Sequence, residues 1–406
     1  MPFARPDVGE DEVDAVRDVL LSGWLTTGER CRAFEHAVAA NVGVAHAVAL
    51  NSCTAALHLS LEAVGVRAGD LVVTTPYTFA STAEVIRYFD AVPVFVDIDP
   101  VTLNIDVGQL ETAVEGLARG DRTLLPPSLR DTVAPRAPVA VLPVHIGGIP
   151  GDTGRLYDLA AEHRMAVVED AAHALPTQPS SHSLAHAERA GVPATACFSF
   201  YATKPVTTGE GGMLVTNDAQ IADRVRIMGL HGLSRDAWGR HGGDDRWRYE
   251  IVAPGFKYNM TDMAAAVGLV QLKKSEVMRS RRRTIAERYN DAFSEFDALE
   301  PPSVPPGVES PWHLYMLRIH PERLTIGRDV LIRRLWERGI ATSIHFIPLH
   351  HHQYYRETFS YVPGDFPVAT REFEREVSLP IYSGMSDLDV GRVIEAVGAV
   401  TVAAAL

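Results

Sequence analysis

Short, almost continuous runs of Val, Ile and Leu alternate with longer segments of helical periodicity along the first half of the chain. The runs are VAHAVAL, DLVVTTP, VPVFVDID, VAVLPVHI and MAVVEDAA. Such runs are typical of strands that helices cover on both faces, because neither face then needs polar side chains. The alternation therefore predicts an α/β fold with a mostly parallel central sheet.

The second half of the chain predicts a further domain. A proline-free segment beginning TDMAAAVGLVQLKK keeps helical periodicity for more than 30 residues, and the rigid run PPSVPPGVESP follows it. Beyond lie an apolar run, WHLYMLRI, a helical pattern around DVLIRRLWERG and a last helix after Ser386. With 406 residues, 46% of them apolar, we expect a large domain at 1–265 and a smaller C-terminal α/β domain at 266–406.

The charge and the cysteines of the chain exclude several kinds of partner and site. The formal net charge is -13 without a long basic tract, which argues against nucleic acid and anionic membranes as partners. The three cysteines show no CxxC spacing, so neither a disulfide framework nor a metal site is expected. The chain opens without a hydrophobic leader and has no apolar run of membrane-spanning length. We expect a cytoplasmic protein.

Polar residues directly after the apolar runs are the candidates for function, because ligands bind beyond the carboxyl ends of parallel strands. Lys204 follows the alternating run CFSFYA and precedes the flexible TTGEGG. A lysine amine forms a Schiff base with the aldehyde of pyridoxal phosphate (PLP), which also needs an anion cradle and an acid at its ring nitrogen. Ser199 offers a hydroxyl to a phosphate. The alternatives are a solvated surface lysine and an ordinary polar strand position.

Three further segments offer the remaining parts of such a site. Asp170 ends a buried strand, where a carboxylate is costly unless it meets a positive partner such as a protonated pyridine nitrogen. The turn NSCTAAL begins a helix at Cys53 and Thr54, and helix N-terminal amides suit a phosphate. Phe79 is placed to stack on a ring. Each segment also has a structural explanation. Asp170 and the turn are each explained as a helix cap, and Phe79 is explained as a core residue.

The ordered set of motifs is nevertheless specific. It consists of NSCTAALHL, TTPYTFASTAEVIRYFDAVPVFVDID, PVHIGGIP, VVEDAAHA, FSFYATKPVTTGEGG, PGFKYNMTDMAAAVGLVQL, HFIPLH and LPIYSGMS. With this set the chain resembles the DegT/DnrJ/EryC1/StrS family of PLP-dependent sugar aminotransferases over nearly its whole length, most closely the UDP-4-amino-4-deoxy-L-arabinose aminotransferase type.

The resemblance implies the PLP-dependent aminotransferase type I fold, a homodimer with shared active sites, and PLP as cofactor. Lys204 would be the Schiff-base lysine, Asp170 the partner of the pyridine nitrogen, and Asn259 a phosphate ligand given by the second subunit. The full set of implied cofactor contacts is Ser52, Cys53, Thr54, Phe79, Asp170, His173, Ser199, Lys204 and Asn259. His345 and Phe346 match a substrate-side motif, although a buried strand histidine is nearly as good an interpretation.

The implied reaction moves an amino group from glutamate, which leaves as 2-oxoglutarate, to a nucleotide-activated 4-keto sugar. The expected sugar is a UDP-4-keto-pentose or hexose. The alternatives are a cyclitol (keto-inositol) aminotransferase, a sugar 3-dehydratase and a non-catalytic regulator on the same fold. The dehydratases resemble this pattern with histidine where this chain has Lys204. Two departures from the family pattern stand out: Cys53 replaces a common glycine, and the segment between Asp170 and Lys204 lacks a glycine-bounded hairpin.

Overall fold

The computed structural model describes residues 1–177, 179–234 and 249–406. Its centre is a seven-stranded sheet in the order β1-β7-β6-β5-β4-β2-β3, in which β7 alone runs against its neighbours. The sheet is thus mostly parallel, as predicted. The strands are β1 (His46–Leu50), β2 (Leu71–Thr74), β3 (Val92–Phe95), β4 (Ala140–Leu142), β5 (Ala166–Asp170), β6 (Ala194–Ser199) and β7 (Gly212–Thr216).

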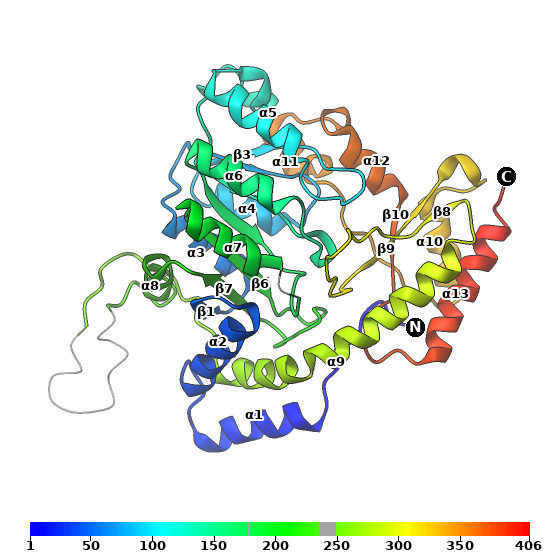
Figure 1. Cartoon of the computed structure of the whole chain (residues 1–406), viewed down its shortest axis with the longest axis horizontal. Helices are drawn as coiled ribbons and strands as arrows, with labels where there is room; N and C mark the ends of the chain where they lie inside the picture. Colours follow the sequence, from blue (N-terminus) through cyan, green and yellow to red (C-terminus); the bar gives the residue numbers. More distant parts are fainter. Residues whose placement is uncertain (178, 235–248) are drawn as a thin grey trace.

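Helices cover both faces of this sheet (Figure 1). On one face pack α3 (Cys53–Ala63), α4 (Ala80–Arg87) and α8 (Ala219–Met228). On the other pack α2 (Glu29–Val42), α5 (Val107–Ala118), α6 (Thr153–His163) and α7 (Pro179–Ala190). The helix α1 (Glu10–Ser22) lies outside this layer and packs on the long helix α9 (Asp262–Phe293).

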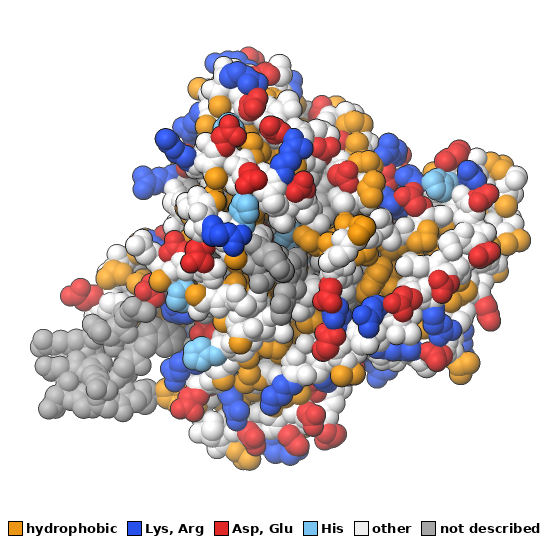
Figure 2. Space-filling model, viewed as in Figure 1, with side chains coloured by type: hydrophobic (Ala, Val, Ile, Leu, Met, Phe, Trp, Pro, Cys, Tyr) orange, Lys and Arg blue, Asp and Glu red, His pale blue; other side chains and the backbone are white. Residues whose placement is uncertain are grey.

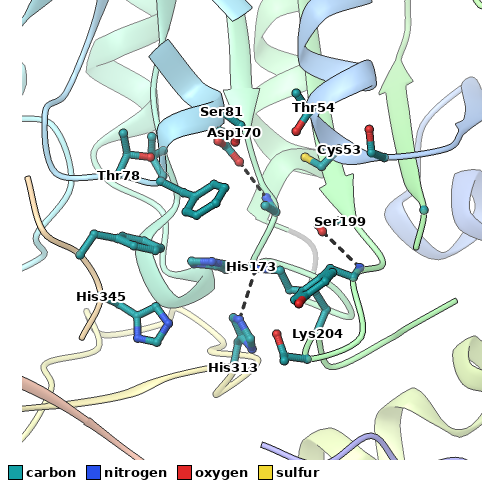
Figure 3. A pocket seen from close by; sticks show the side chains of 18 of the residues that line it. Cys53, Thr54, Thr78, Ser81, Asp170, His173, Ser199, Lys204, His313 and His345 are labelled. Carbon is teal, nitrogen blue, oxygen red and sulfur yellow. Dashed lines mark hydrogen bonds between the residues drawn. The ribbon is translucent and has the colours of Figure 1, made fainter. Parts of the chain in front are cut away.

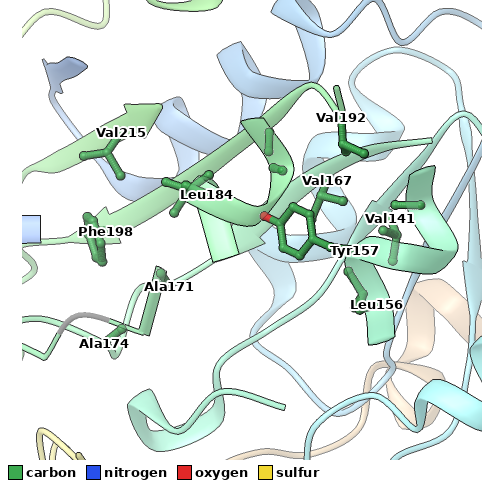
Figure 4. Close-up of a cluster of buried hydrophobic side chains, with 14 of the residues drawn as sticks. Val141, Leu156, Tyr157, Val167, Ala171, Ala174, Leu184, Val192, Phe198 and Val215 are labelled. Atoms are coloured by element: carbon green, nitrogen blue, oxygen red, sulfur yellow. The ribbon is translucent and has the colours of Figure 1, made fainter. Parts of the chain in front are cut away.

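Strand β5 shows why the apolar runs become central strands. Successive side chains of a strand point to opposite faces. Val167 joins the cluster beneath α6 and α7, where it lies with Tyr157 and Leu184 (Figure 4), while Val168 joins the cluster beneath α3 and α8. Both faces of β5 are therefore buried in apolar surroundings, and the polar residues of this strand are confined to its carboxyl end.

The predicted long helix is α9 (Asp262–Phe293), which runs from the large sheet to the C-terminal part of the chain (Figure 1). The Thr261 hydroxyl caps it by accepting a hydrogen bond from the Ala264 amide. Ala265, in its first turn, packs in the core of the large sheet, and Tyr289, near its end, packs in the second core. The predicted boundary at residue 265 falls within this first turn and stays a prediction.

A second core surrounds a three-stranded antiparallel sheet in the order β10-β9-β8. Its elements are β8 (Leu299–Glu300), β9 (Tyr315–Ile319), α10 (Arg328–Glu337), β10 (Glu376–Leu379) and α13 (Asp387–Val402). Two short helices, α11 (Gln353–Phe359) and α12 (Pro367–Arg375), pack instead near the carboxyl ends of β2 and β3. Their cluster joins Tyr77, after β2, and Phe95, the last residue of β3, to Tyr355 and Phe366.

Short 3-10 helices complete the described secondary structure. They are η1 (Arg122–Leu124), η2 (Pro127–Leu129), η3 (Ile146–Gly148), η5 (Pro321–Arg323), η6 (Leu349–His351) and η7 (Pro363–Asp365). The segment that lacks the family's hairpin contains α7. None of the described helices has the length and apolar character needed to cross a membrane. On the face shown in Figure 2, acidic and basic side chains are interspersed, in keeping with the absence of a basic tract in the sequence.

Candidate active site

A cavity of about 470 Å³ opens where strands β2, β5 and β6 end. Its floor comes from the sheet, and its opposite side comes from the C-terminal part of the chain and the N-terminal Phe3 (Figure 3). The described residues that line it are Phe3, Ser52, Cys53, Thr54, Thr78, Phe79, Ser81, Val144, Asp170, Ala172, His173, Ser199, Tyr201, Thr203, Lys204, Glu210, Gly211, His313, His345 and Phe346.

Asp170 is a buried carboxylate at this floor, on the last residue of β5. Its Oδ2 atom accepts a hydrogen bond of 2.7 Å from the Thr82 hydroxyl, and Oδ1 accepts one of 3.2 Å from the Ala172 amide. Thr82 is in turn 2.7 Å from the Thr78 hydroxyl. Burial raises the pKa of Asp170, while Thr82, Ala172 and Lys204 act to lower it. The carboxylate is oriented by fixed donors and faces the cavity.

Lys204 lies half-buried across the cavity from this carboxylate. Burial lowers the pKa of its amine to about 8, although Cys53 and Asp170 act in the opposite direction. The amine is 3.4 Å from Nε2 of His313. Burial, and then the nearby Lys204, hold the pKa of His313 well below its usual value, so the imidazole is neutral and accepts this hydrogen bond. A lysine in this setting deprotonates near neutral pH and becomes a nucleophile and a base.

The N-terminus of α3 forms another part of the floor. Ser52 caps the helix by accepting a hydrogen bond of 3.0 Å from the Ala55 amide, and Cys53 and Thr54 open its first turn beside the cavity. The Cys53 thiol points to the Cys197 carbonyl at 3.5 Å. Gly212 lets β7 approach this turn, because a Cβ atom at that position would overlap the backbone of Ser52 and Cys53. The turn presents free helix amides, which suit an anion.

Aromatic and imidazole rings enclose the rest of the cavity. His173 is buried, and its Nδ1 atom accepts a hydrogen bond of 3.2 Å from the Gly147 amide. Its ring lies 4.7 Å from the His313 ring and stacks at 5.9 Å on Phe346. Phe79 is 62% exposed and lies 6.2 Å from Phe346, so its ring is available to a molecule in the cavity.

Most of the residues predicted from the sequence meet at this cavity. They are Ser52, Cys53, Thr54, Phe79, Asp170, His173, Ser199, Lys204, His345 and Phe346. Asn259 is not among the described residues that line it. Its side chain bonds Thr27 at 2.7 Å and Lys257 at 2.6 Å. Four arginines close together in the sequence are candidates for a pyrophosphate-binding patch, with a solvated basic loop as the alternative, and they lie outside the described residues: Arg235, Arg240, Arg246 and Arg248.

Among the residues that sequence reasoning missed are two that hydrogen-bond the ionisable groups of the site, Thr82 and His313. Thr82 lies one helical turn after Thr78, a spacing that brings two side chains together, but nothing in the sequence aims this pair at Asp170. His313 precedes β9, far from Lys204 in the chain, so no local pattern joins the two. Among the described residues, no three His, Cys, Asp or Glu side chains gather as metal ligands would.

Comparison with known proteins decides the family. Residues 6–398 match the model of the DegT/DnrJ/EryC1/StrS aminotransferase family. The chain belongs to this family. It is 45% identical over 397 residues to the uncharacterized protein MJ1066 of Methanocaldococcus jannaschii, with 98% of this chain and 96% of that protein covered. It is 44% identical over 398 residues to the spore coat polysaccharide biosynthesis protein SpsC of Bacillus subtilis, with the same coverage, 98% and 96%.

A solved structure agrees in fold over the whole length. The putative sugar aminotransferase Spr1654 of Streptococcus pneumoniae, in its PMP form, superposes with a TM-score of 0.85 at 31% identity, covering 99% of each chain. Its PLP form gives a TM-score of 0.83 at 30% identity, again with 99% of each chain covered. The resemblance and the fold predicted from the sequence are thus confirmed, and this family member is a PLP-dependent aminotransferase.

The cavity fits this cofactor on the evidence of its own residues. A phosphate needs hydrogen-bond donors, which the first turn of α3 supplies. Gly212 has no Cβ atom, which allows this turn to pack closely against β7. A protonated pyridine nitrogen needs a carboxylate that stays oriented without solvent, and Asp170 is held so by Thr82. The aldehyde needs an amine that loses its proton readily, and Lys204 has such an amine.

Proposed function

We propose that this aminotransferase transfers an amino group from glutamate to a nucleotide-activated 4-keto sugar, a UDP-4-keto-pentose or hexose, giving a 4-amino sugar nucleotide. The observation that carries the proposal is the meeting of Lys204, Asp170 and the N-terminus of α3 around one cavity. The names of two similar proteins support a sugar as acceptor: SpsC belongs to spore coat polysaccharide biosynthesis, and Spr1654 is described as a sugar aminotransferase.

In the proposed mechanism, the bound cofactor supplies an electron sink for the negative charge that develops on the substrate carbon. Asp170 keeps the ring-nitrogen proton in place, which deepens that sink. The α3 amides, with Ser52, Thr54 and Ser199, hold the phosphate. The Lys204 amine would take the proton from the substrate carbon and hold it for its return, a positioned transfer that typically contributes about 10² to 10⁴ in rate.

The reaction is proposed as two half-reactions of ping-pong type. Glutamate would enter first, exchange its amino group for the oxygen of one water molecule and leave as 2-oxoglutarate, and the bound cofactor would carry the amino group to the second half-reaction. The keto sugar then enters, accepts the amino group, and its carbonyl oxygen leaves as water. Lys204 would serve both half-reactions, because each one removes a proton from a substrate carbon or returns one to it. Residues on the opposite side of the cavity, including His345 and Phe346, are proposed to contact the sugar.

The test is product analysis with a panel of acceptors. The purified enzyme, PLP and ¹⁵N-glutamate are incubated with UDP- and dTDP-linked 4-keto and 3-keto sugars and with keto-inositol, and the products are identified by mass spectrometry. Label appearing in a UDP-4-amino sugar supports the proposal. Label appearing only in the aminated cyclitol replaces it by cyclitol amination, and a 3-deoxy sugar without label replaces it by dehydration. Lys204 argues against dehydration, because the dehydratases resemble this pattern with histidine at this position.

A non-catalytic role is tested in the same preparation. Glutamate alone should convert the absorbance of the bound cofactor to that of its amino form and release 2-oxoglutarate in one equivalent per site. Absorbance that glutamate leaves unchanged would favour a regulator over an enzyme.

The proposal includes a homodimer whose active sites are shared, with Asn259 of one protomer reaching the phosphate bound by its partner. Its support is that Asn259 does not line the cavity of its own chain, as far as the described residues show. Mixing two inactive variants tests it. Lys204→Ala and Asn259→Ala protomers, refolded together, should regain activity, because one site of each mixed dimer is then intact. A double variant mixed with inactive Lys204→Ala protein should not.

We also propose a cytoplasmic location, which the three free and buried thiols support. Fluorescence microscopy of the tagged protein in its own host tests it, and signal confined to the envelope would contradict it.

A further inference from the structure

A chain of hydrogen bonds leads from the cavity wall into the core of the C-terminal part of the protein. The His345 ring lines the cavity, and its Nδ1 atom is 2.8 Å from the Ser378 hydroxyl. That hydroxyl donates a hydrogen bond of 2.5 Å to Oε1 of Glu376. The other carboxylate oxygen, Oε2, accepts one of 2.9 Å from the His345 backbone amide. Three groups that can each pass on a proton are thus joined in series.

The far end of this chain is sealed from water. Glu376 and Ser378 are both fully buried on β10. Bonding at Nδ1 leaves Nε2 as the ring nitrogen of His345 available to the cavity, where Phe3 stacks on the same ring at 5.6 Å. A proton on Glu376 therefore has a path to the cavity through Ser378 and His345.

We propose that Glu376, Ser378 and His345 form a proton relay, in which the buried carboxyl decides whether Nε2 of His345 offers the sugar substrate a hydrogen-bond donor or an acceptor. The proposal rests on the proposed sugar aminotransferase function. Glu376 and Ser378 act here as positioning residues, because neither touches the cavity.

The proton count follows from the donor and acceptor rules for each group. With Glu376 ionised, Ser378 donates to the carboxylate, Nδ1–H of His345 donates to Ser378, and Nε2 carries a lone pair. With Glu376 protonated, the carboxyl donates to Ser378, Ser378 donates to Nδ1, and Nε2 carries the hydrogen. When Nε2 takes up one proton, the Nδ1 proton moves to Ser378 and the Ser378 proton moves to Glu376. The proton taken up stays on Nε2, and the ring remains neutral.

The relay lets His345 exchange a proton without becoming a cation. A charged imidazole is costly at this place, since burial and the nearby Lys204 lower the pKa of His345 to about 3. His173 and His313, the other titratable neighbours on this side, are likewise neutral for the same reasons. The carbonyl oxygen of a keto sugar must gain protons before it leaves as water, and the relay supplies one through a neutral ring.

The charged surroundings of Glu376 fit a group that changes its protonation state near neutral pH. Burial raises its pKa to about 8, while Ser378, the His345 amide and the Arg328 guanidinium on α10 act to lower it. Tyr77, which follows β2 and lies within electrostatic reach of Glu376, stays neutral because burial and then Glu376 raise its pKa. Both protonation states of Glu376 are therefore accessible between neutral and mildly alkaline pH.

The test reads the position of the hydrogen on His345 directly. In the holoenzyme with ¹⁵N-labelled histidine rings, solid-state NMR distinguishes a protonated from an unprotonated ring nitrogen, and a His345→Gln spectrum assigns the signal among the 16 histidines. Between about pH 6 and about pH 10 we expect the hydrogen to move from Nε2 to Nδ1, with no cationic form. A single form throughout, or a cation, would overturn the relay.

Variants separate the relay from a structural role. Glu376→Gln cannot ionise, and Ser378→Ala breaks the chain, so in both the pH-dependent movement should disappear. Ser378→Thr keeps the hydroxyl and should keep the movement. Movement that persists in Glu376→Gln would also overturn the proposal.

Activity gives an independent reading of the same variants. With the UDP-4-keto sugar, Ser378→Ala should lower kcat about 10- to 100-fold with a smaller change in KM, and Ser378→Thr should recover most of it. Failure of the aminotransferase assay in the wild-type protein would count against the proposed function alone, because the NMR result does not depend on turnover.

Discussion

The two sides of the cavity are built in different ways. The sheet side takes Asp170, Ser199 and the α3 turn from the carboxyl ends of strands, where a parallel sheet must gather them. The opposite side takes His313 and His345 from the C-terminal part of the chain, which only the tertiary fold brings near. Asp170, at the end of β5, and Lys204, which follows β6, form the ionisable pair of the site, whereas the opposite side holds neutral imidazoles.

This difference suggests a division of labour. Chemistry common to both half-reactions needs fixed charges and a phosphate cradle, which the rigid sheet supplies. Recognition of the sugar needs neutral donors and acceptors, which the opposite side supplies. Changes on the sheet side should therefore impair both half-reactions, and changes on the opposite side should impair the sugar half-reaction more.

The largest effect is expected for Lys204→Ala. Loss of the amine removes both the covalent anchor and the proton carrier, so turnover should fall by more than about 10⁴-fold. PLP should still bind noncovalently through the α3 turn and Asp170. Single-turnover absorbance with glutamate and with the sugar measures both halves, and Lys273→Ala, on the exposed face of α9, is the matched control. Normal turnover in Lys204→Ala would refute the assignment.

Asp170→Asn should come next. The amide keeps the shape of the side chain but loses the negative charge that holds the ring-nitrogen proton, so both half-reactions should slow by about 10²- to 10³-fold. The same substitution at the exposed Asp90 serves as control. An effect confined to the sugar half-reaction would contradict the division between the two sides.

The sequence predicts the sheet side of the cavity better than the opposite side. The apolar runs predicted the sheet, and the residues at their ends predicted most of its side of the cavity, because strand direction alone fixes where a strand end lies. Asp170 could be named for its position, but the donor that orients it, Thr82, depends on how α4 packs on the sheet. His313 and the path from Glu376 to His345 depend on contacts between distant segments, which no local pattern records.

Thr82→Val tests the support of Asp170 at a smaller scale. Valine keeps the shape but removes the hydroxyl that lowers the pKa of Asp170, so that pKa should rise further. The carboxylate must be ionised to act, and ionisation is lost as pH falls through the raised pKa. Activity on the acid side should therefore be lost at a higher pH than in the wild type, with about a tenfold decrease near neutral pH. Thr82→Ser, which keeps the donor, should restore the wild-type profile of rate against pH.

The smallest effect is expected for His313→Phe. The neutral imidazole accepts a hydrogen bond from the Lys204 amine, which favours the protonated amine. Its loss should lower the pKa of Lys204 below about 8. A lowered lysine pKa makes the free amine available at lower pH, so capture of added PLP by the apoenzyme should reach half its maximum at a pH lower by up to about 1.

Stopped-flow absorbance of the covalently bound cofactor against pH measures this. His186→Phe, a change of the same kind at a histidine that pairs with Asp158 outside the cavity, should leave the midpoint where it is. A midpoint that rises in His313→Phe would mean that the imidazole opposes the lysine charge instead of accepting its hydrogen. The opposite side of the cavity would then tune Lys204 by repulsion, and its neutrality could no longer explain the division of labour.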